Sequence, residues 1–167
     1  FSELESMNDS YRIPFEKFFL STLQDRLHNG HKTLLEIGCG EESQLIFYLN
    51  QGLEVTAINP TVSKSNRINF VKGYYGKADV DDKFDIIVSR FNLEHIGDVE
   101  KFFTALKKNL NADGRVVIQV PNAKLFLELG MLNVFAHEHV HYFSIQSLAL
   151  MAFNNGFSVS NVSSKNE

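Results

Sequence analysis

Cysteine and tryptophan are almost missing from this sequence, which has 1 Cys, no Trp and 3 Pro among 167 residues. A single cysteine excludes an intrachain disulfide framework and any Cys₂ or Cys₄ zinc site, and we expect a reducing, cytoplasmic location. No apolar run reaches the roughly 18 residues that a membrane-spanning helix needs, and no signal-peptide layout opens the chain. With few prolines and no low-complexity tract to mark a linker, we expect one domain over residues 1–167.

An excess of charge of one sign is also lacking. The 16 Lys and Arg residues stand against 20 Asp and Glu, which gives a net charge of −4. This balance disfavours electrostatic capture of nucleic acid or of an anionic membrane surface, so we expect neither partner. Apolar bulk is plentiful, since 44% of residues are hydrophobic and 15 are Phe. The chain can therefore build a real core, while its composition predicts no oligomeric state.

Short apolar runs alternate with amphipathic segments along the chain. Apolar residues at helical spacing predict a helix over residues 14–27, within an N-terminal helical segment 1–30. Near-continuous apolar strands between amphipathic helices are typical of an α/β fold with a doubly wound, mostly parallel sheet, here over residues 31–167. In such sheets, ligands bind beyond the carboxyl ends of the strands. The predicted strands are residues 33–37, 53–58, 67–72, 84–89 and 116–120, with a sixth from Gly156; the predicted helices are 43–50, one capped by Asp98 and one from Ser144 to Asn154.

Gly38 and Gly40 form a Gly-x-Gly turn between the first predicted strand and the helix that follows it. Such a turn lets the backbone approach a ligand closely, although a tight strand-to-helix turn also needs glycine for structural reasons. The third glycine of a dinucleotide fingerprint is missing, because Glu41 and Glu42 follow, and two carboxylates there would repel a pyrophosphate. No Gly-Lys-Ser/Thr follows, which excludes a P-loop. The pattern favours a ligand without phosphate groups.

The run Leu-Leu-Glu-Ile-Gly-Cys-Gly at residues 34–40 resembles motif I of class I S-adenosylmethionine (SAM)-dependent methyltransferases. Three later segments resemble that family in the same order: Phe-Asp-Ile-Ile-Val-Ser at 84–89, Leu-Glu-His-Ile at 93–96 and Ala-Asp-Gly-Arg at 112–115. The resemblance covers about residues 30–163. It implies a Rossmann-like methyltransferase fold and SAM as the cofactor, and we expect the last strand of that fold to be missing from this chain.

By the same resemblance, Asn59 lies at the end of the second strand, near the cofactor ribose. The family usually has Asp or Glu there, and an amide lacks the charge that strengthens a hydrogen bond to a hydroxyl. Tyr74 or Tyr75 flanks the adenine or is an ordinary loop tyrosine, and Arg90 faces the cofactor or solvent. The predicted cofactor-binding residues are Glu36, Gly38, Cys39, Gly40, Asn59, Tyr74 and Arg90.

Three histidines alternate with other residues in His-Glu-His-Val-His, residues 137–141. The run matches the His-Glu-x-x-His pattern of zinc peptidases, but Val140, Tyr142 and Phe143 favour an extended chain over the helix that such a site needs. In an extended chain the three imidazoles share one face, where they could hold a transition metal or form ordinary hydrogen bonds. We assign no metal ligand here.

Val-Pro-Asn at 120–122 and His-Glu-His-Val-His-Tyr-Phe-Ser at 137–144 resemble SAM-dependent C-methyltransferases of nucleotide-linked ketosugars. The resemblance implies that His139 is the base that deprotonates the acceptor, with Glu138 as its neighbour, while His95 stabilises the enolate. Imidazole, with an ordinary pKa near about 6.5, suits proton transfer at neutral pH.

We therefore expect SAM-dependent methyl transfer to a small molecule, a sugar or glycan precursor. The alternative is a catalytically inactive, methyltransferase-like domain that serves as a binding or regulatory partner. Asn59 and Glu42 favour this alternative, because both depart from the family pattern beside the cofactor.

Overall fold

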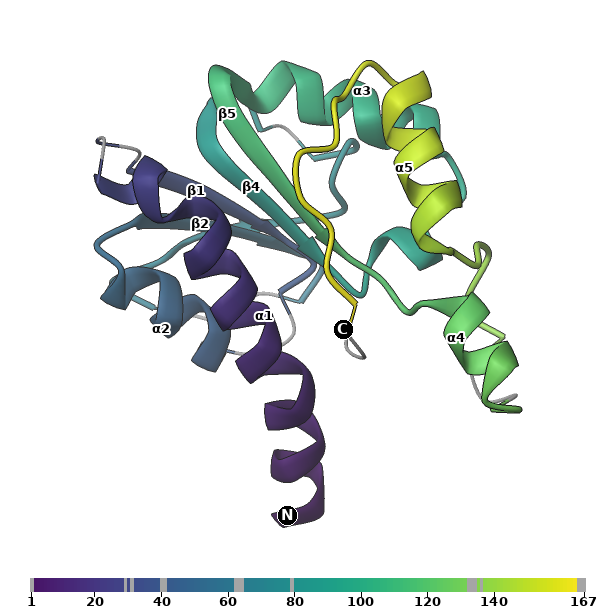
Figure 1. The fold of residues 1–167 in the computed structure, drawn as a ribbon. Helices are drawn as coiled ribbons and strands as arrows, with labels where there is room; N and C mark the ends of the chain where they lie inside the picture. The colour runs from purple at the N-terminus through teal and green to yellow at the C-terminus, as the bar shows by residue number, and fades with distance from the viewer. Residues whose placement is uncertain are drawn as a thin grey trace.

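Five parallel strands form the sheet of the computed structural model (Figure 1), in the spatial order β3-β2-β1-β4-β5. The strands are β1 (Thr33–Ile37), β2 (Glu54–Asn59), β3 (Asn69–Lys72), β4 (Phe84–Arg90) and β5 (Leu110–Gln119). The helices are α1 (Ser2–His28), α2 (Glu42–Asn50), α3 (Val99–Asn109), α4 (Ala123–Glu128) and α5 (Ile145–Asn154), with a 3₁₀ turn η1 (Leu93–His95). The structure describes residues 2–28, 30, 32–39, 42–61, 65–78, 80–131, 135 and 137–164.

Helices cover both faces of the sheet because successive side chains of a strand point to opposite faces. Leu34 packs in a core with Phe19 of α1 and Tyr48 of α2, whereas Leu35 packs in a second core with Phe103 of α3. All five side chains are buried. The predicted doubly wound α/β fold is therefore confirmed.

The chain leaves neighbouring strands β1 and β4 toward opposite faces of this sheet. After β1 it enters α2, which packs on the first core, and after β4 it passes through η1 to α3 on the second core. A crevice forms where the connections of adjacent strands diverge, and ligands of open α/β sheets bind there. The topology therefore directs attention to the carboxyl ends of β1 and β4.

Two helix starts follow the capping chemistry read from the sequence. The Asp98 side chain accepts a hydrogen bond from the backbone N–H of Lys101 at 3.1 Å, which caps α3. The Ser144 hydroxyl accepts one from the backbone N–H of Ser147 at 3.1 Å, and the Ser147 hydroxyl accepts one from the N–H of Ser144 at 2.9 Å. The N-cap of α3 and the capping box of α5 satisfy N–H groups that a helix leaves unpaired.

The expected helix start at Pro14 is wrong, because α1 begins at Ser2 and Pro14 lies inside it. Leu4, Met7 and Tyr11 continue the helical spacing before Pro14, but proline is common in the first turn of a helix, which favoured a start at Pro14. The stripe that was predicted does pack, since Phe15, Phe19 and Leu23 are all buried. Inside α1, Pro14 removes one N–H donor and its ring crowds the carbonyl four residues earlier, a local cost that does not end the helix.

The expected sixth strand is also wrong for the described residues, since 157–164 contain no strand. A strand needs a hydrogen-bonding neighbour, and a cavity lies between this segment and the nearest edge strand, β5. In Figure 1 the segment, drawn in yellow, returns from α5 past β5 toward the C-terminus. Among the described helices, none is both long and apolar enough to cross a membrane.

Asp85 joins three segments at the amino end of the sheet. Its carboxylate accepts hydrogen bonds from the backbone N–H groups of Lys32 and Thr33, at 2.9 and 3.1 Å, from the Thr33 hydroxyl and from the Asn111 amide. Partial burial raises the pKa of Asp85, but these hydrogen bonds outweigh it and lower the pKa to about 2.

We expect Asp85→Ala to lower the free energy of unfolding at pH 7 by about 2 kcal/mol, because two backbone donors lose their acceptor. The lowered pKa means that the carboxylate contributes stability above the ordinary value of 3.8, and that this contribution disappears as the pH falls through about 2. The difference between variant and wild type should therefore shrink in acid. Urea unfolding at pH 7 and pH 3 measures it, and an equal difference at both values would contradict the ionic role.

Candidate functional site

The glycine turn after β1 packs directly on the turn after β4. Gly38 has φ +74°, a conformation that side chains disfavour, and its N–H donates to the carbonyl of Ile58 at the end of β2 at 2.9 Å. A Cβ on Gly38 would lie 2.9 Å from Oδ1 and 3.3 Å from Cβ of Asn92. Only glycine therefore allows the ends of β1, β2 and β4 to meet this closely.

Asn59 at the end of β2 holds the glycine turn in place. Its Nδ2 donates a short hydrogen bond to the carbonyl of Cys39 and lies 3.7 Å from the Cys39 Sγ. Its Oδ1 accepts from the backbone N–H and the hydroxyl of Thr61, both at 3.1 Å. Burial raises the pKa of the half-buried Cys39 thiol. Gly40, the second glycine of the predicted turn, lies outside the described residues.

Glu36 is a buried carboxylic acid at this edge of the sheet, with 2% of its surface exposed. The Tyr48 hydroxyl donates to its Oε2 at 2.8 Å. Burial raises the pKa of Glu36 to about 7, although the charge of Arg90 and the hydrogen bond from Tyr48 act in the opposite direction. At neutral pH this group therefore exists in both the neutral and the ionised form.

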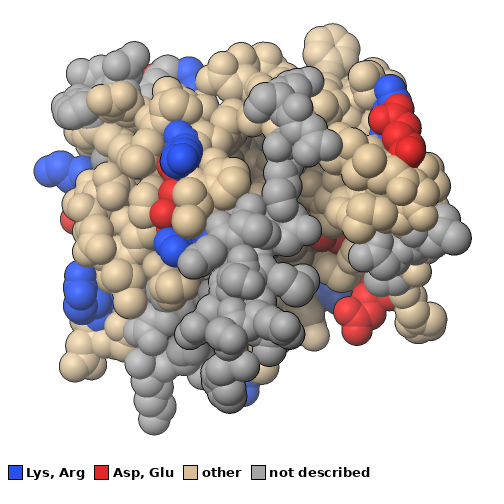
Figure 2. All heavy atoms as spheres, turned by 60° about the horizontal axis from the view of Figure 1, so that its bottom comes forward, with Lys and Arg blue, Asp and Glu red and all other residues tan. Residues whose placement is uncertain are grey.

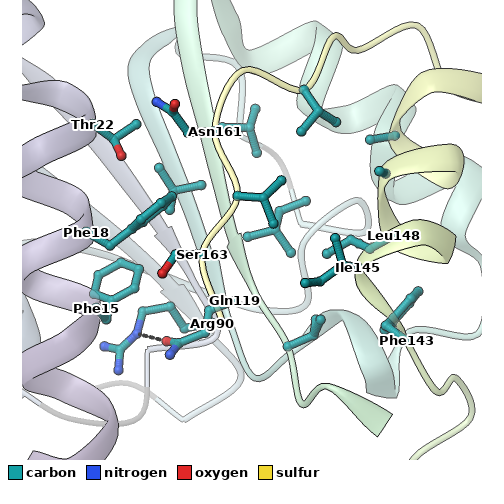
Figure 3. Close-up of a pocket in the computed structure, with 18 of the residues that line it drawn as sticks. Phe15, Phe18, Thr22, Arg90, Gln119, Phe143, Ile145, Leu148, Asn161 and Ser163 are labelled. Atoms are coloured by element: carbon teal, nitrogen blue, oxygen red, sulfur yellow. Dashed lines mark hydrogen bonds between the residues drawn. The ribbon is translucent and has the colours of Figure 1, made fainter. Parts of the chain in front are cut away.

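Arg90 at the end of β4 is anchored by two glutamines and an aromatic ring. Its Nε donates to Oε1 of Gln119 at 2.9 Å, its NH1 donates to Oε1 of Gln44 at 2.5 Å, and its guanidinium carbon lies 4.5 Å from the ring centre of Phe15. Figure 3 shows Arg90 and Phe15 side by side, with the Gln119 hydrogen bond dashed. Arg90 is thus a fixed positive charge in the wall of a cavity.

A cavity of about 1700 Å³ begins at the glycine turn and continues along the free edge of β5 (Figure 3). Near the carboxyl ends of the strands it is lined by Gly38, Cys39 and Arg90. Farther along, Figure 3 shows Phe18 and Thr22 of α1 on one side and Ile145 and Leu148 of α5 on the other, with Asn161 and Ser163 between them. The cavity exceeds the roughly 300–1000 Å³ of ordinary ligand pockets, since it combines the edge crevice with the groove beside β5.

Backbone hydrogen bonds dock residues 138–141 onto η1. The N–H groups of Val140 and His141 both donate to the carbonyl of Glu94, at 2.9 and 3.1 Å. The His95 Nδ1 lies 2.9 Å from the carbonyl oxygen of Glu138. Segments more than 40 residues apart in sequence thereby meet at the end of β4.

The predicted histidines come together there. The rings of His95 and His139 lie 4.8 Å apart between centroids, edge to face. Glu138, predicted as the neighbour of His139, contributes its carbonyl oxygen, while its side chain is exposed. The carboxylate beside the imidazoles is that of Glu94, whose pKa is raised by burial while the charges of His95 and His139 lower it. Its place between Leu93 and His95, in the Leu-Glu-His-Ile run just past a strand, was the available sequence signal for it.

Tyr74 follows β3 and is 65% exposed, with the ammonium of Lys77 5.9 Å from its ring centre. Its neighbour Tyr75 instead turns inward, and its hydroxyl donates to Asn109 at 3.1 Å. Burial raises the pKa of Tyr75 far above the ordinary value of 10.0. Of the two tyrosines, only Tyr74 presents its ring to solvent at this edge.

Described charges are scattered on the face seen in Figure 2, where Lys and Arg alternate with Asp and Glu among uncharged side chains. No large patch of one sign appears among the side chains that are coloured there. Selection of a ligand therefore depends on the crevice and its individual polar groups rather than on a broad electrostatic field.

A parallel sheet of order 3-2-1-4-5, with a glycine turn at the crevice between β1 and β4, defines the class of doubly wound α/β domains that bind nucleotide-like ligands. The chain belongs to the family of methyltransferase domains, because the family model described as "Methyltransferase domain" matches residues 12–162. This finding agrees with the class I methyltransferase motifs of the sequence.

Individual relatives are distant. The ubiquinone biosynthesis O-methyltransferase of Rickettsia akari is 26% identical in an alignment 106 residues long, which covers 57% of this chain and 42% of the relative. The chain thus spans less than half the length of this relative. The 1,6-didemethyltoxoflavin-N1-methyltransferase of Burkholderia thailandensis, solved with its substrate and S-adenosylhomocysteine (SAH), superposes with a TM-score of 0.71 at 16% identity, covering 96% of this chain and 73% of its own. The plantazolicin methyltransferase superposes with a TM-score of 0.75 at 16% identity, covering 92% and 66%.

Proposed function

We propose that this domain binds SAM in the crevice between β1 and β4 and transfers its methyl group to a small-molecule acceptor. The observation that carries the proposal is the glycine turn after β1: Gly38 packs closely on Asn92 beyond the end of β4, and it lines the cavity with backbone because it has no side chain. Buried Gln44 Nε2, which lacks a hydrogen-bond partner among the described residues and whose side chain lines the cavity, is a donor suited to a carboxylate or hydroxyl oxygen of the cofactor. When bound, SAM supplies a methyl group on a sulfonium leaving group.

We propose that the cofactor-binding residues predicted from the sequence act in three ways: by presenting backbone, by holding the turn and by facing the ligand. Gly38 and Cys39 present backbone to the cofactor, Glu36 lies beneath the turn, and Gly40 stays a prediction from the sequence. Asn59 acts mainly by holding the turn, because both ends of its amide already have protein partners. Tyr74 offers an exposed ring to the adenine side, and Arg90 offers a charge on the acceptor side.

His95 and His139 are the groups that we propose to act on the acceptor. His139 accepts the proton that the reacting group of the acceptor loses as its bond to the methyl carbon forms. His95, which donates its Nδ1–H to the Glu138 carbonyl, stabilises the developing negative charge in its protonated form, in which Nε2 is also a donor. A positioned imidazole in such a role contributes typically 10²–10⁴-fold to the rate. Holding the acceptor close to the SAM methyl group supplies much of the remaining rate acceleration.

The acceptor that these features favour is an apolar small molecule with an acidic hydroxyl. Phe15, Leu125, Phe126 and Met131 line the cavity near the carboxyl ends of β4 and β5, and such walls suit an aromatic ring better than a sugar. The relative from Rickettsia akari is named an O-methyltransferase of ubiquinone biosynthesis, in keeping with a ring hydroxyl. The sugar or glycan acceptor expected from the sequence remains a second candidate, favoured by the His-Glu-His segment alone.

Calorimetry with SAH tests the proposal first. We expect saturable binding in the micromolar range, and absence of binding at millimolar SAH would overturn the enzyme in favour of an inactive, methyltransferase-like domain. Transfer of labelled methyl from SAM is then followed with 3,4-dihydroxybenzoate and with a nucleotide-linked ketosugar as acceptors. Label on the phenol supports O-methylation, whereas label on the ketosugar alone overturns it.

With whichever acceptor is labelled, His139→Ala should lower turnover by about 100-fold, because the acceptor then loses its proton unaided. His137→Ala is the matched control, since His137 lies exposed in the same segment and should keep wild-type turnover. Steady-state rates at saturating SAM measure both variants. Equal turnover of His139→Ala and wild type would remove His139 from the reaction.

A further inference from the structure

A buried carboxylate and two imidazoles converge beside the crevice, in a cluster made of Glu94, His95 and His139. One ligand atom from each residue lies within 4.8 Å of the others. We propose that this cluster binds a divalent transition-metal ion such as Zn²⁺, with a coordination position left open for an oxygen of the acceptor. The open position rests on the proposed function; the binding of the ion does not.

The first observation concerns Glu94, which is 2% exposed. Its Oε2 is buried and has no hydrogen-bond partner among the described residues, and its Oε1 lies 4.0 Å from Nε2 of His95. A buried carboxylate oxygen without a hydrogen-bond partner is costly, and such an atom is often satisfied by an ion or ligand. The unsatisfied oxygen belongs to a carboxylate that faces the two imidazoles.

The second observation concerns the orientation of His95. A carbonyl oxygen only accepts, so the 2.9 Å contact with Glu138 requires the proton on Nδ1 of His95. Nε2 then carries the free lone pair, and it is the atom that faces Glu94. Histidines that bind metals almost always donate their other N–H to a carbonyl or carboxylate in this way.

The third observation is that backbone hydrogen bonds hold the segment of His139 against η1. The two N–H groups that follow it in sequence, of Val140 and His141, are both bound to the Glu94 carbonyl. His139 therefore cannot leave Glu94 without the loss of two hydrogen bonds. The cluster joins a strand end and a distant loop, as a metal site commonly does.

The geometry suits a small ion after modest adjustment. Zn–N and Zn–O bonds of about 2.0–2.1 Å place tetrahedral ligand atoms about 3.4 Å apart. The side chain of His95 is 35% exposed, so a small tilt that keeps its Nδ1 contact with Glu138 lets a cluster spanning 4.8 Å close. Two His and one Glu form a ligand set of zinc enzymes that keep a fourth position for water or substrate.

The ion changes the role of His139 when it is bound. As a ligand, His139 no longer takes up the acceptor proton; the ion instead acidifies a hydroxyl that coordinates to it, and the proton passes to solvent. The methyl carbon then bonds to the metal-held oxygen as its bond to sulfur breaks. Metal-free protein retains the direct route through His139.

The test titrates ZnCl₂ into the full chain, cleared of metal by a chelator, in a calorimeter. We expect one ion per chain with a Kd in the micromolar range or below, and Co²⁺ in place of Zn²⁺ should give visible absorption of a low-coordinate site. Glu94→Gln and His139→Ala should each weaken zinc binding by at least about 100-fold. His137→Ala, which removes an exposed imidazole two residues from His139, should bind zinc as the wild type does.

Two results would overturn the site. Equal zinc affinity of His139→Ala, Glu94→Gln and the wild type would show that the cluster is not the binding site. Equal weakening by His137→Ala would instead place zinc on a site that includes the exposed His137. Circular dichroism establishes that Glu94→Gln, which keeps the shape of the side chain, is folded. SAH binding in EDTA separates the two proposals, because it can persist when zinc binding fails.

Discussion

Gly38→Ala should weaken SAH binding by at least about 100-fold, which corresponds to about 2.7 kcal/mol. At φ +74° an L side chain costs about 1–2 kcal/mol, and the new Cβ would also meet three atoms of Asn92 within 3.3 Å. Rotation of the amide cannot relieve this contact, because Asn92 Cβ is itself one of the three atoms. The turn after β1 must therefore move away from the turn after β4, and the crevice changes shape. Calorimetry with SAH measures the loss.

Gly52→Ala is the control for the cost of a side chain at a positive φ. Gly52 has φ +79°, but a Cβ there would meet nothing within 4 Å. We expect this variant to lose about 1 kcal/mol of unfolding free energy and to bind SAH as the wild type does. In the double variant Gly38→Ala, Asn92→Ala, part of the SAH affinity should return. If Gly38→Ala bound SAH with undiminished affinity, the close packing at the crevice would have no role in cofactor binding.

Glu36→Gln should stabilise the protein at pH 8 by about 2–3 kcal/mol and leave it nearly unchanged at pH 4. Burial raises the pKa of Glu36 to about 7 from 4.5, so the folded state keeps its proton at a pH where the unfolded chain has lost it. Wild-type stability consequently falls as the pH rises from about 4.5 to 7 and stays reduced above that. Glutamine does not ionise, and its carbonyl can still accept from Tyr48.

Urea unfolding at pH 4 and pH 8 measures this effect. Glu54→Gln provides the control, because Glu54 is an exposed carboxylate at the start of the adjacent strand β2. That substitution should leave stability within about 0.5 kcal/mol of the wild type at both pH values. A Glu36→Gln protein that is no more stable than the wild type at pH 8 would contradict the buried, partly protonated carboxyl.

Features of the fold that depend on neighbours in sequence could be predicted. The strands at residues 33–37 and 84–90 could be predicted because they are apolar runs. The caps at Asp98 and Ser144 could be predicted because each side chain bonds to a residue only three positions away. The turn at Gly38 was visible for the same reason. Local chemistry of this kind does not depend on where the rest of the chain lies.

Features that depend on partners far away in the sequence could not be predicted in full. No spacing reveals that the Asn59 amide donates to the carbonyl of Cys39, 20 residues away, and the place of Asn59 near the cofactor ribose stays a prediction. Glu94 belongs to the Leu-Glu-His-Ile run that drew attention to His95, but the sequence could not show that Glu94 is buried beside His139. That burial follows from the docking of residues 138–141 onto η1. The segment after Gly156 has strand-like residues without a neighbouring strand to pair with. Each of these outcomes depends on tertiary contacts.

The contact between Gly38 and Asn92 also connects the proposed SAM site with the proposed zinc site. Asn92 is the residue that precedes η1, the turn that carries Glu94 and His95, and it rests against the glycine turn proposed for the cofactor. Whatever factor SAH imposes on the affinity of the cluster for zinc, zinc must impose the same factor on the affinity for SAH, because the two paths around a binding cycle have equal free energy. A pair of titrations, each performed with and without the other ligand, would therefore measure in solution how firmly these two turns are joined.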